Sequence, residues 1–558
     1  MGRPKKPTPA LTRWIRPRRS GQSWQENLQN HRDRKKANDG ADSIGTDASL
    51  TTPPLTWQTI NWPRIRQEVR RLQMRIAKAT QAGQHRKAQA LQWVLTHSRS
   101  AKLLAVHRVT TNRGAKTPGV DNVRWRTDRQ KLQAAFNLKR HGYRPRPLRR
   151  HYIPKSNGKL RPLSIPTMHD RAMQALHALA LAPIAETLAD RNSYGFREGR
   201  RCIDALEQCF RYLMLRTCAP WVLEGDIRAC FDEISHDWLL QHVPMDKQLL
   251  KAWLKAGYWE KEQLFPTAAG TPQGGLISPL LANFALDGME EIVKAGTKRG
   301  DKVHFVRYAD DFIVTGATRQ ILEQKVKPAL TAFLAKRGLQ LSEQKTVLTH
   351  ISTGFNFLGH TVRKYEDKLR ITPAKSKVVA VRKKIGELIH STVGLSQEAL
   401  LRQLNPLLRG WANYYRNAAS QRTFDKLDYY VCHRLWRWIK RRHPNASTAW
   451  KRRKYFTAAG DKRVFSVRIR AKEGETRVLT LYRVSSTKSN ATLRSGGLPT
   501  RMTLNTPNTL RNVAASCGAC SEPVGHPSGH RQAPSIKVFY RRLTAAACPS
   551  QSAPVGAT

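Results

Sequence analysis

Two adjacent carboxylates interrupt an otherwise apolar stretch of the chain. Asp310 and Asp311 stand in FVRYADDFIVT, between segments 303–306 and 312–314, which are rich in the β-branched and aromatic residues typical of strands. An Asp-Asp pair between such segments is most often a tight turn. On a rigid hairpin, the same pair can hold a divalent cation, which relieves the repulsion that would otherwise make one carboxylate take up a proton.

A third carboxylate has a similar setting. Asp226 stands near the end of the strand expected from Trp221 onward, in WVLEGDIRACFDE. A lone Asp at this position is most often a helix cap or a turn residue. Brought beside the hairpin, it would complete the all-oxygen ligand set that Mg²⁺ prefers.

Other segments are expected to position these carboxylates. Residues 57–109 carry apolar residues at helical spacing, with Lys and Arg on the remaining faces. HYIPKSNGKLRPLSIP, from His151, predicts two strands joined by a turn at 156–158, with Lys155, Lys159 and Arg161 around its tip. Cations at a turn are usually only solvated, but this hairpin could also grip phosphates. GTPQGG, from Gly270, is a loop whose backbone can approach a ligand closely.

The charge balance indicates a polyanionic partner. The chain has 558 residues, with 98 Lys and Arg against 40 Asp and Glu, for a formal net charge of +58. Nucleic acid is the first candidate, and an anionic membrane surface is the second. The most apolar segment, 175–189, is interrupted by His177, Pro183 and Glu186 and is expected to be a core helix, so no membrane span is predicted. The length predicts two to four domains, and the eight scattered cysteines favour a reducing compartment.

The ordered motifs resemble the reverse transcriptases encoded by group II introns. The strand-end Asp226, the Pro-Gln-Gly loop and the Tyr-Ala-Asp-Asp hairpin follow the order of that family, as do TPGVD, SYGFREGR, GLQLSEQKT and FNFLGH. LNPLLRGWANYYRN, from Leu404, is similar to the maturase region, or domain X. The resemblance covers about residues 57–467. It implies an α+β right-hand polymerase with fingers, a palm with an antiparallel sheet, and a helical thumb and domain X, preceded by a helical N-terminal extension.

The domain boundaries follow from the resemblance and the composition. We expect a disordered basic arm at 1–56, the N-terminal extension at 57–140, fingers and palm at 141–362, thumb and domain X at 363–469, and a tail without structure at 470–558. In that tail, Cys517, Cys520, His526 and His530 have a zinc-like spacing, but too little apolar sequence separates the pairs to fold around a metal. A complete HNH endonuclease is therefore not expected.

The resemblance also assigns roles at the polymerase site. Two Mg²⁺ ions would be bridged by Asp226 and Asp310 and supported by Asp311, with the backbone carbonyl of Ile227 nearby. Phe231 would lie under the sugar of the incoming nucleotide. The other expected nucleotide contacts are Lys155, Lys159, Arg161, Gln273 and, more weakly, Lys345. Tyr308, Pro272 and Gly274 would position the primer and the templating base.

In domain X, the resemblance implies contacts to RNA, although most aromatic side chains there are expected in the core. The expected contacts are Arg409, Trp411, Tyr414, Tyr415, Arg416 and Arg437. Such a mixture of cations and aromatic rings suits phosphates and stacked bases.

The implied function is an RNA-directed DNA polymerase that binds its group II intron RNA, a DNA target or primer, and deoxynucleoside triphosphates. It would assist splicing and support intron mobility by target-primed reverse transcription. A splicing-only maturase with a lapsed polymerase is one alternative, and a non-intron bacterial reverse transcriptase is another, which NPLLRGWANYY disfavours. A bacterial cytoplasmic location is expected, although the Arg-rich N-terminus also permits an organellar transit peptide. The sequence leaves open whether the protein forms a homodimer.

Overall fold

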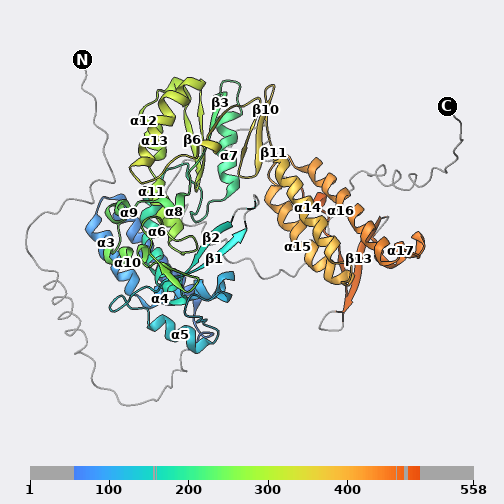
Figure 1. Cartoon of the computed structure of the whole chain (residues 1–558), viewed down its shortest axis with the longest axis horizontal. Helices are drawn as coiled ribbons and strands as arrows, with labels where there is room; N and C mark the ends of the chain where they lie inside the picture. Colours follow the sequence, from blue (N-terminus) through green and yellow to red (C-terminus); the bar gives the residue numbers. More distant parts are fainter. Residues whose placement is uncertain (1–55, 155–157, 159, 460–461, 471–474, 490–558) are drawn as a thin grey trace, which may run out of the picture. The chain divides into compact units, whose positions relative to one another are not determined.

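The computed structural model describes residues 56–489 except 155–157, 159, 460–461 and 471–474 (Figure 1). The predicted basic arm, Lys155, Lys159, and the cysteines and histidines of the tail lie outside the described residues. The described strands form four sheets.

The N-terminal part is helical, as the apolar periodicity predicted. Its helices are α2 (Trp62–Gln81), α3 (His85–His97), α4 (Arg99–Thr111) and α5 (Asp128–Phe136). Asn61 caps α2 by accepting the Arg64 N–H, and Ser98 caps α4 in the same way through the Ala101 N–H. Helices α2, α3 and α4 pack apolar residues, including Ile76 and Leu95, against α6 (Met168–Leu188), and α5 packs against α4.

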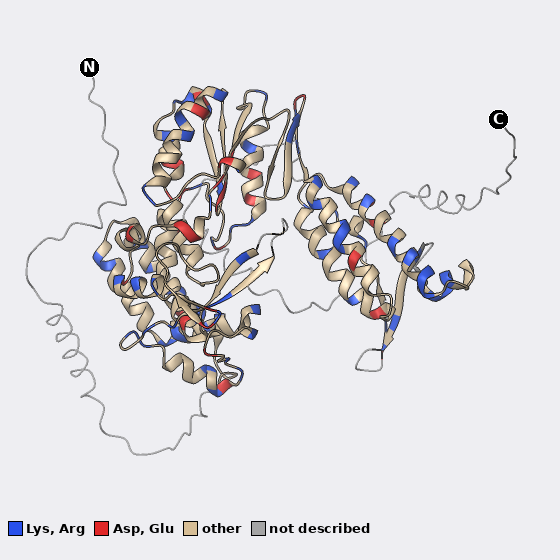
Figure 2. Cartoon of the chain, viewed as in Figure 1, with Lys and Arg blue, Asp and Glu red and all other residues tan. Residues whose placement is uncertain are grey.

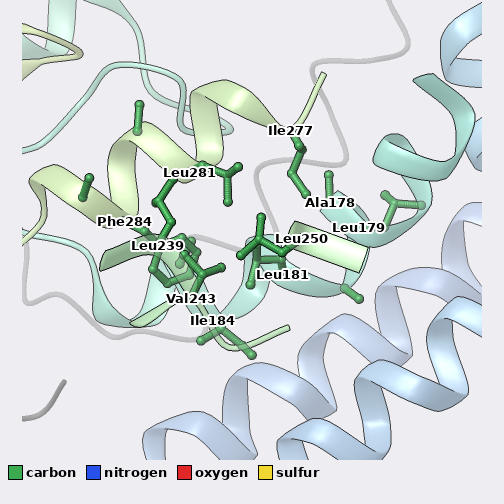
Figure 3. Close-up of a cluster of buried hydrophobic side chains, with 14 of the residues drawn as sticks. Ala178, Leu179, Leu181, Ile184, Leu239, Val243, Leu250, Ile277, Leu281 and Phe284 are labelled. Carbon is green, nitrogen blue, oxygen red and sulfur yellow. The ribbon is translucent and has the colours of Figure 1, made fainter. Parts of the chain in front are cut away.

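Helix α6 is apolar on most of its faces because other helices surround it. Figure 3 shows Leu181 and Ile184 of α6 among side chains from α9 (His236–His242), α10 (Lys247–Leu254) and α11 (Ser278–Leu286). The expectation that residues 175–189 form a core helix is confirmed. Within the described part of the chain, no helix combines the length and apolar character needed to cross a membrane.

A four-stranded antiparallel sheet, in the order β6-β7-β3-β8, carries the predicted carboxylates. Its strands are β3 (Trp221–Asp226), β6 (His304–Tyr308), β7 (Asp311–Gly316) and β8 (Val347–His350). Side chains alternate between two cores: Leu223 and Phe312 face one, and Val222 and Ile313 face the other. Helices α12 (Met289–Ala295) and α13 (Lys327–Ala335) cover the first face, and α7 (Cys202–Leu213) covers the second (Figure 1).

A second sheet, in the order β2-β1-β4-β5, contains the predicted hairpin. Its strands are β1 (Leu148–Pro154), β2 (Leu160–Ile165), β4 (Tyr258–Glu260) and β5 (Gln263–Phe265), and β1 pairs with β4 in parallel. A third sheet is formed by β9 (Phe355–Phe357), β10 (His360–Tyr365) and β11 (Lys368–Pro373). The short helix α8 (Cys230–Glu233) follows β3.

The C-terminal part has its own core, built by Leu404, Leu408, Phe424 and Trp438 among others. Its elements are α14 (Lys375–Ser391), α15 (Gln397–Tyr415), α16 (Gln421–Arg442), α17 (Thr448–Tyr455), β12 (Phe456–Ala459), β13 (Lys462–Arg470) and β14 (Thr476–Thr480). The expectation of an unstructured tail from residue 470 is wrong for 475–489. Strand β14 pairs with β13, and Val484 is buried in this core, because TRVLTLYRV supplies apolar residues to cover it.

Candidate active site

The Asp-Asp hairpin turns one residue earlier than its sequence suggests. Strands β6 and β7 are joined by Ala309 and Asp310, so that Asp310 lies at the tip and Asp311 begins β7. Ala309 has a φ of 58°, a conformation that costs free energy for a residue with a side chain. Its backbone is pressed against Gly195, where an added Cβ would lie 2.2 Å from the Ala309 nitrogen. The SYGF segment therefore supports the turn directly.

The side chain of Arg307 stabilises the turn through a hydrogen bond and a buried ion pair. The sequence analysis did not identify this residue. Its side chain is fully buried and forms an ion pair with Asp287 at 2.5 Å. The same guanidinium donates to the Asn283 side chain at 3.2 Å and to the Ala309 carbonyl at 3.3 Å, while Asn283 donates to the Gly195 carbonyl at 3.0 Å. The sequence did contain a signal for this ion pair, because Arg307 stands inside an otherwise apolar strand. A buried arginine is almost always paired with a carboxylate or another polar group.

The structure brings the three predicted aspartates together. Asp226 ends β3 and lies directly opposite Asp311 in the register of β3 with β7. Burial, together with the negative charges of Asp310 and Asp226, raises the pKa of Asp311 to about 6. Burial also raises the pKa of Asp310, with Asp226 adding to the effect. The cluster thus favours a bound cation, because positive charge would relieve the cost of ionising neighbouring carboxylates.

Lys345 supplies a positive charge to this cluster. It belongs to the short helical turn Glu343–Lys345, and its Nζ lies 2.8 Å from Oδ2 of Asp226. This hydrogen bond raises the pKa of Lys345. The Lys345 side chain is 67 % exposed, and its pairing with Asp226 was not predicted from the sequence.

The carboxylate oxygens of the three aspartates suit Mg²⁺, although their side chains do not converge on one point. Among the described residues, no three His, Cys, Asp or Glu side chains converge as they do around a metal ion. All the donors offered by Asp226, Asp310 and Asp311 are oxygens, the ligand type of hard cations. The side chain of Ile227 is a buried hydrocarbon without ligand atoms, so its backbone carbonyl is the one metal ligand it can offer.

The Pro-Gln-Gly loop links the second sheet to α8. The Gln273 side chain donates to Asp232 at 2.8 Å and accepts from Nε of Arg161 at 2.7 Å. Gly274 has a φ of 118°, and an added Cβ would lie 2.6 Å from the Ser164 carbonyl. Only glycine fits there without displacing β2. The preceding Pro272 carbonyl accepts from the Ser278 hydroxyl at 2.9 Å, which ties the loop to α11.

Phe231 and Tyr308 lie on α8 and β6. Phe231 is partly buried and meets Phe196 edge to face, with ring centroids 6.0 Å apart. Phe196 is half exposed, so one side of this aromatic pair is open. A hydrogen bond with Cys202, together with burial, raises the pKa of Tyr308 to about 12.

The expected RNA contacts divide into exposed and buried residues. Arg409, Arg416 and Arg437 are exposed, and Figure 2 shows many Lys and Arg along α14 to α17. Arg409 lies within α15, with its guanidinium 5.1 Å from the Tyr482 ring centroid.

The aromatic residues of this segment are mostly packed inward. Tyr415 is 4 % exposed and donates to the Gly359 carbonyl at 3.2 Å, so its assignment as an RNA contact is wrong. Trp411 packs against the same core. Tyr414 is 46 % exposed, although its hydroxyl donates to the Leu358 carbonyl.

Comparisons with known proteins match the geometry. Residues 153–362 match the family "Reverse transcriptase (RNA-dependent DNA polymerase)", and residues 57–138 match "N-terminal domain of reverse transcriptase". Residues 378–456 match "Group II intron, maturase-specific domain". The chain is 30 % identical over 429 residues to the group II intron-encoded protein LtrA of Lactococcus lactis, covering 59 % of this chain and 70 % of that protein. The chain belongs to the group II intron-encoded reverse transcriptase and maturase family.

Two further similarities were found. Protein YkfC of Escherichia coli is 34 % identical over 301 residues, which cover 45 % of this chain and 78 % of YkfC. A solved telomerase structure from Candida albicans aligns at a TM-score of 0.32 and 13 % identity, covering 55 % of this chain and 64 % of the telomerase. The reverse transcriptase match, which includes all three aspartates, identifies the chain as an RNA-directed DNA polymerase with a mixed helix and sheet fold.

Proposed function

We propose that this group II intron-encoded reverse transcriptase copies RNA into DNA at a two-metal site built by Asp226, Asp310 and Asp311. The observation that carries the proposal is the register of β3 with β7, which sets Asp226 opposite Asp311 beside the hairpin tip. When bound, two Mg²⁺ ions would lower the pKa of the attacking primer hydroxyl and stabilise charge on the leaving pyrophosphate.

The protein's own residues bind and orient the substrates. Asp226, Asp310 and Asp311 would hold the metal ions through their carboxylate oxygens. Arg161, whose Nε donates to the Gln273 side chain, would bind the triphosphate of the incoming deoxynucleotide. The same role is proposed from the sequence for Lys155 and Lys159, which lie outside the described residues. Lys345 would neutralise the charge of Asp226 before the metal ions and the nucleotide bind. Tyr308, Pro272 and Gly274 would position the primer and the templating base.

The right-hand description follows from these roles. The β2-β1-β4-β5 sheet would form the fingers, the β6-β7-β3-β8 sheet the palm, and α14 to α16 the thumb and domain X. We further infer that the chain binds its intron RNA, assists splicing, and uses a DNA target as primer during intron mobility. This inference is supported by the match to the maturase-specific domain and the exposed arginines of α15 and α16.

Sugar selection is expected to depend on Phe231. In Phe231→Val, the open side of the Phe196–Phe231 pair widens, so that a 2′-hydroxyl can be accommodated. The ratio of ribonucleotide to deoxynucleotide incorporation should rise roughly tenfold to a hundredfold, the range for a few methylene-sized groups in a pocket. Steady-state kinetics with each nucleotide measures the ratio. Phe231→Tyr keeps the ring and should keep the selectivity; an unchanged ratio in a folded Phe231→Val protein would make Phe231 a plain core residue.

RNA binding is expected to depend on exposed arginines of the C-terminal part. Changing Arg409, Arg416 and Arg437 to Ala should weaken intron RNA binding and splicing. The salt dependence of binding should flatten by about one unit of slope for each arginine that no longer neutralises a phosphate. Primer extension on a short template should change less, because the aspartates are untouched.

A matched control removes the same charge from arginines that already have carboxylate partners. Arg211, Arg216 and Arg319 are exposed and pair with Glu207, Asp367 and Glu323. Their triple Ala variant should keep the slope of the wild type. Thermal melts of both triple variants are measured first, to establish that each is folded. Equal slopes for the two triple variants would make α15 and α16 structural rather than RNA-binding elements.

A further inference from the structure

A cavity of about 780 Å³ lies in the helical part of the chain, and the catalytic aspartates do not line it. Its walls come from α3, α4, α6, residues 138–141 and residues 244–248, which connect α9 to α10 and begin α10. This volume falls in the range of sites that bind small molecules. Nothing in the polymerase mechanism uses it.

The cavity combines an apolar floor with an aromatic rim. Met173, Leu176 and Ala180 of α6 line it together with Leu138 and Pro244. At the rim, Trp93 is 53 % exposed and therefore accessible to a ligand. The Trp93 ring stacks on His97 with centroids 4.1 Å apart, and Nδ1 of His97 hydrogen-bonds the Trp93 carbonyl at 2.8 Å. A ring that is exposed yet held in place is a platform for another planar group.

Two of the three Lys and Arg side chains that line the cavity have no carboxylate partner among the described residues. The lining residues include Lys102, Lys139 and Arg140, and their one carboxylate, Asp246, is already paired with Arg140 at 2.6 Å. Lys102 and Lys139 have no ion pair within the described part of the chain. Burial, together with the charge of Lys139, lowers the pKa of Lys102. An anion between the two ammonium groups would relieve this repulsion.

His177 adds a hydrogen-bonding group to the cavity wall. Burial lowers its pKa to about 4, so its imidazole is neutral at neutral pH. It meets Trp253 edge to face, with ring centroids 5.6 Å apart, and forms no hydrogen bond with any described residue. A neutral imidazole offers one donor and one acceptor, and the nearby Gln89 amide offers both kinds as well.

We propose that this cavity binds one nucleotide, with its base against Trp93 and the α6 floor and its phosphate between Lys102 and Lys139. His177 and Gln89 would contact the polar edge of the base. The nucleotide is either an unpaired residue of a bound RNA or a free nucleotide. Its identification as part of the intron RNA rests on the proposed function, whereas the cavity and its chemistry do not.

Photo-crosslinking of the full chain tests the proposal. The probes are a short single-stranded RNA carrying one iodouracil and, separately, azidoadenosine monophosphate, with the labelled peptides identified by mass spectrometry. We expect label in the peptide that contains Trp93. Trp93→Ala, and separately Lys102→Ala with Lys139→Ala, should reduce that label about tenfold, which is the effect of losing one stacked base.

Matched controls come from the same helical part of the chain. Phe136→Ala removes an aromatic side chain that is 52 % exposed, almost the same fraction as Trp93, but it does not line the cavity. Lys78→Ala with Lys87→Ala removes two exposed charges from α2 and α3, also outside the cavity. Both control variants should keep the label.

The outcomes separate the sources of the nucleotide. Label from RNA alone assigns an unpaired RNA residue, and label from both probes assigns a site that also takes free nucleotides. Equal labelling of folded Trp93→Ala and Phe136→Ala, or no label in any cavity peptide, would overturn the proposal. Primer extension in the same preparations is independent: its failure alongside retained labelling would count against the polymerase site and not against the cavity.

Discussion

Asp310→Asn combined with Asp311→Asn is expected to abolish DNA synthesis on an RNA template. Amides keep the size of the side chains but remove the negative charge that would bind the metal ions, and the remaining Asp226 is already paired with Lys345. We expect a loss of about a thousandfold or more, equivalent to about 4 kcal/mol of transition-state stabilisation. Single-turnover primer extension measures the loss.

The chain offers a second adjacent pair of acids as a control. Glu366 and Asp367 join β10 to β11, so Glu366→Gln with Asp367→Asn removes the same charge from another hairpin. That variant should extend primers like the wild type. The Asp310 and Asp311 variant should still melt cooperatively and bind intron RNA, because the C-terminal arginines are unchanged. Undiminished synthesis would refute the metal-site assignment.

Asp287→Asn is expected to destabilise the catalytic hairpin by about 3 to 5 kcal/mol. The change leaves the fully buried guanidinium of Arg307 without its counter-charge, and breaking a buried pair in this way is strongly destabilising. Burial raises the pKa of Asp287 to about 6, despite the attraction of Arg307, so the carboxylate is still ionised at neutral pH. Hydrogen exchange in peptides covering residues 304–316 reports the free energy of opening.

Two further variants test whether Arg307 positions the turn or only stabilises the fold. Asp367→Asn breaks the exposed pair with Arg216 and should change stability by at most about 1 kcal/mol. Arg307→Met with Asp287→Leu replaces the buried pair by apolar groups and should recover part of the protection against exchange. DNA synthesis should stay low in that double variant, because the Ala309 carbonyl no longer has its donor. Full recovery of synthesis would leave Arg307 with a purely structural role.

The sequence by itself determined those helices and strands that are encoded by patterns of neighbouring residues. The helices of residues 57–109, the β1–β2 hairpin and the strand ending at Asp226 follow from apolar spacing and turn residues, which neighbouring positions encode. The three aspartates were identified from their setting and from the family motif. Strand β14 at 476–480 and the short helical turn at 484–486 were missed because their apolar residues lie next to a long polar tail.

Only the tertiary structure decided which distant residues meet. The register of β3 with β7 sets Asp226 against Asp311, and Lys345 reaches the same carboxylate from another segment. Gly195 lies against Ala309 because their backbones pack without an intervening side chain, which no local pattern encodes. Tyr414 and Tyr415 are neighbouring tyrosines, yet Tyr414 is exposed and Tyr415 faces the core. Burial, and therefore the pKa of each carboxylate and the pairing of Arg307, depends on contacts between segments far apart in sequence, so it could be read only from the folded chain.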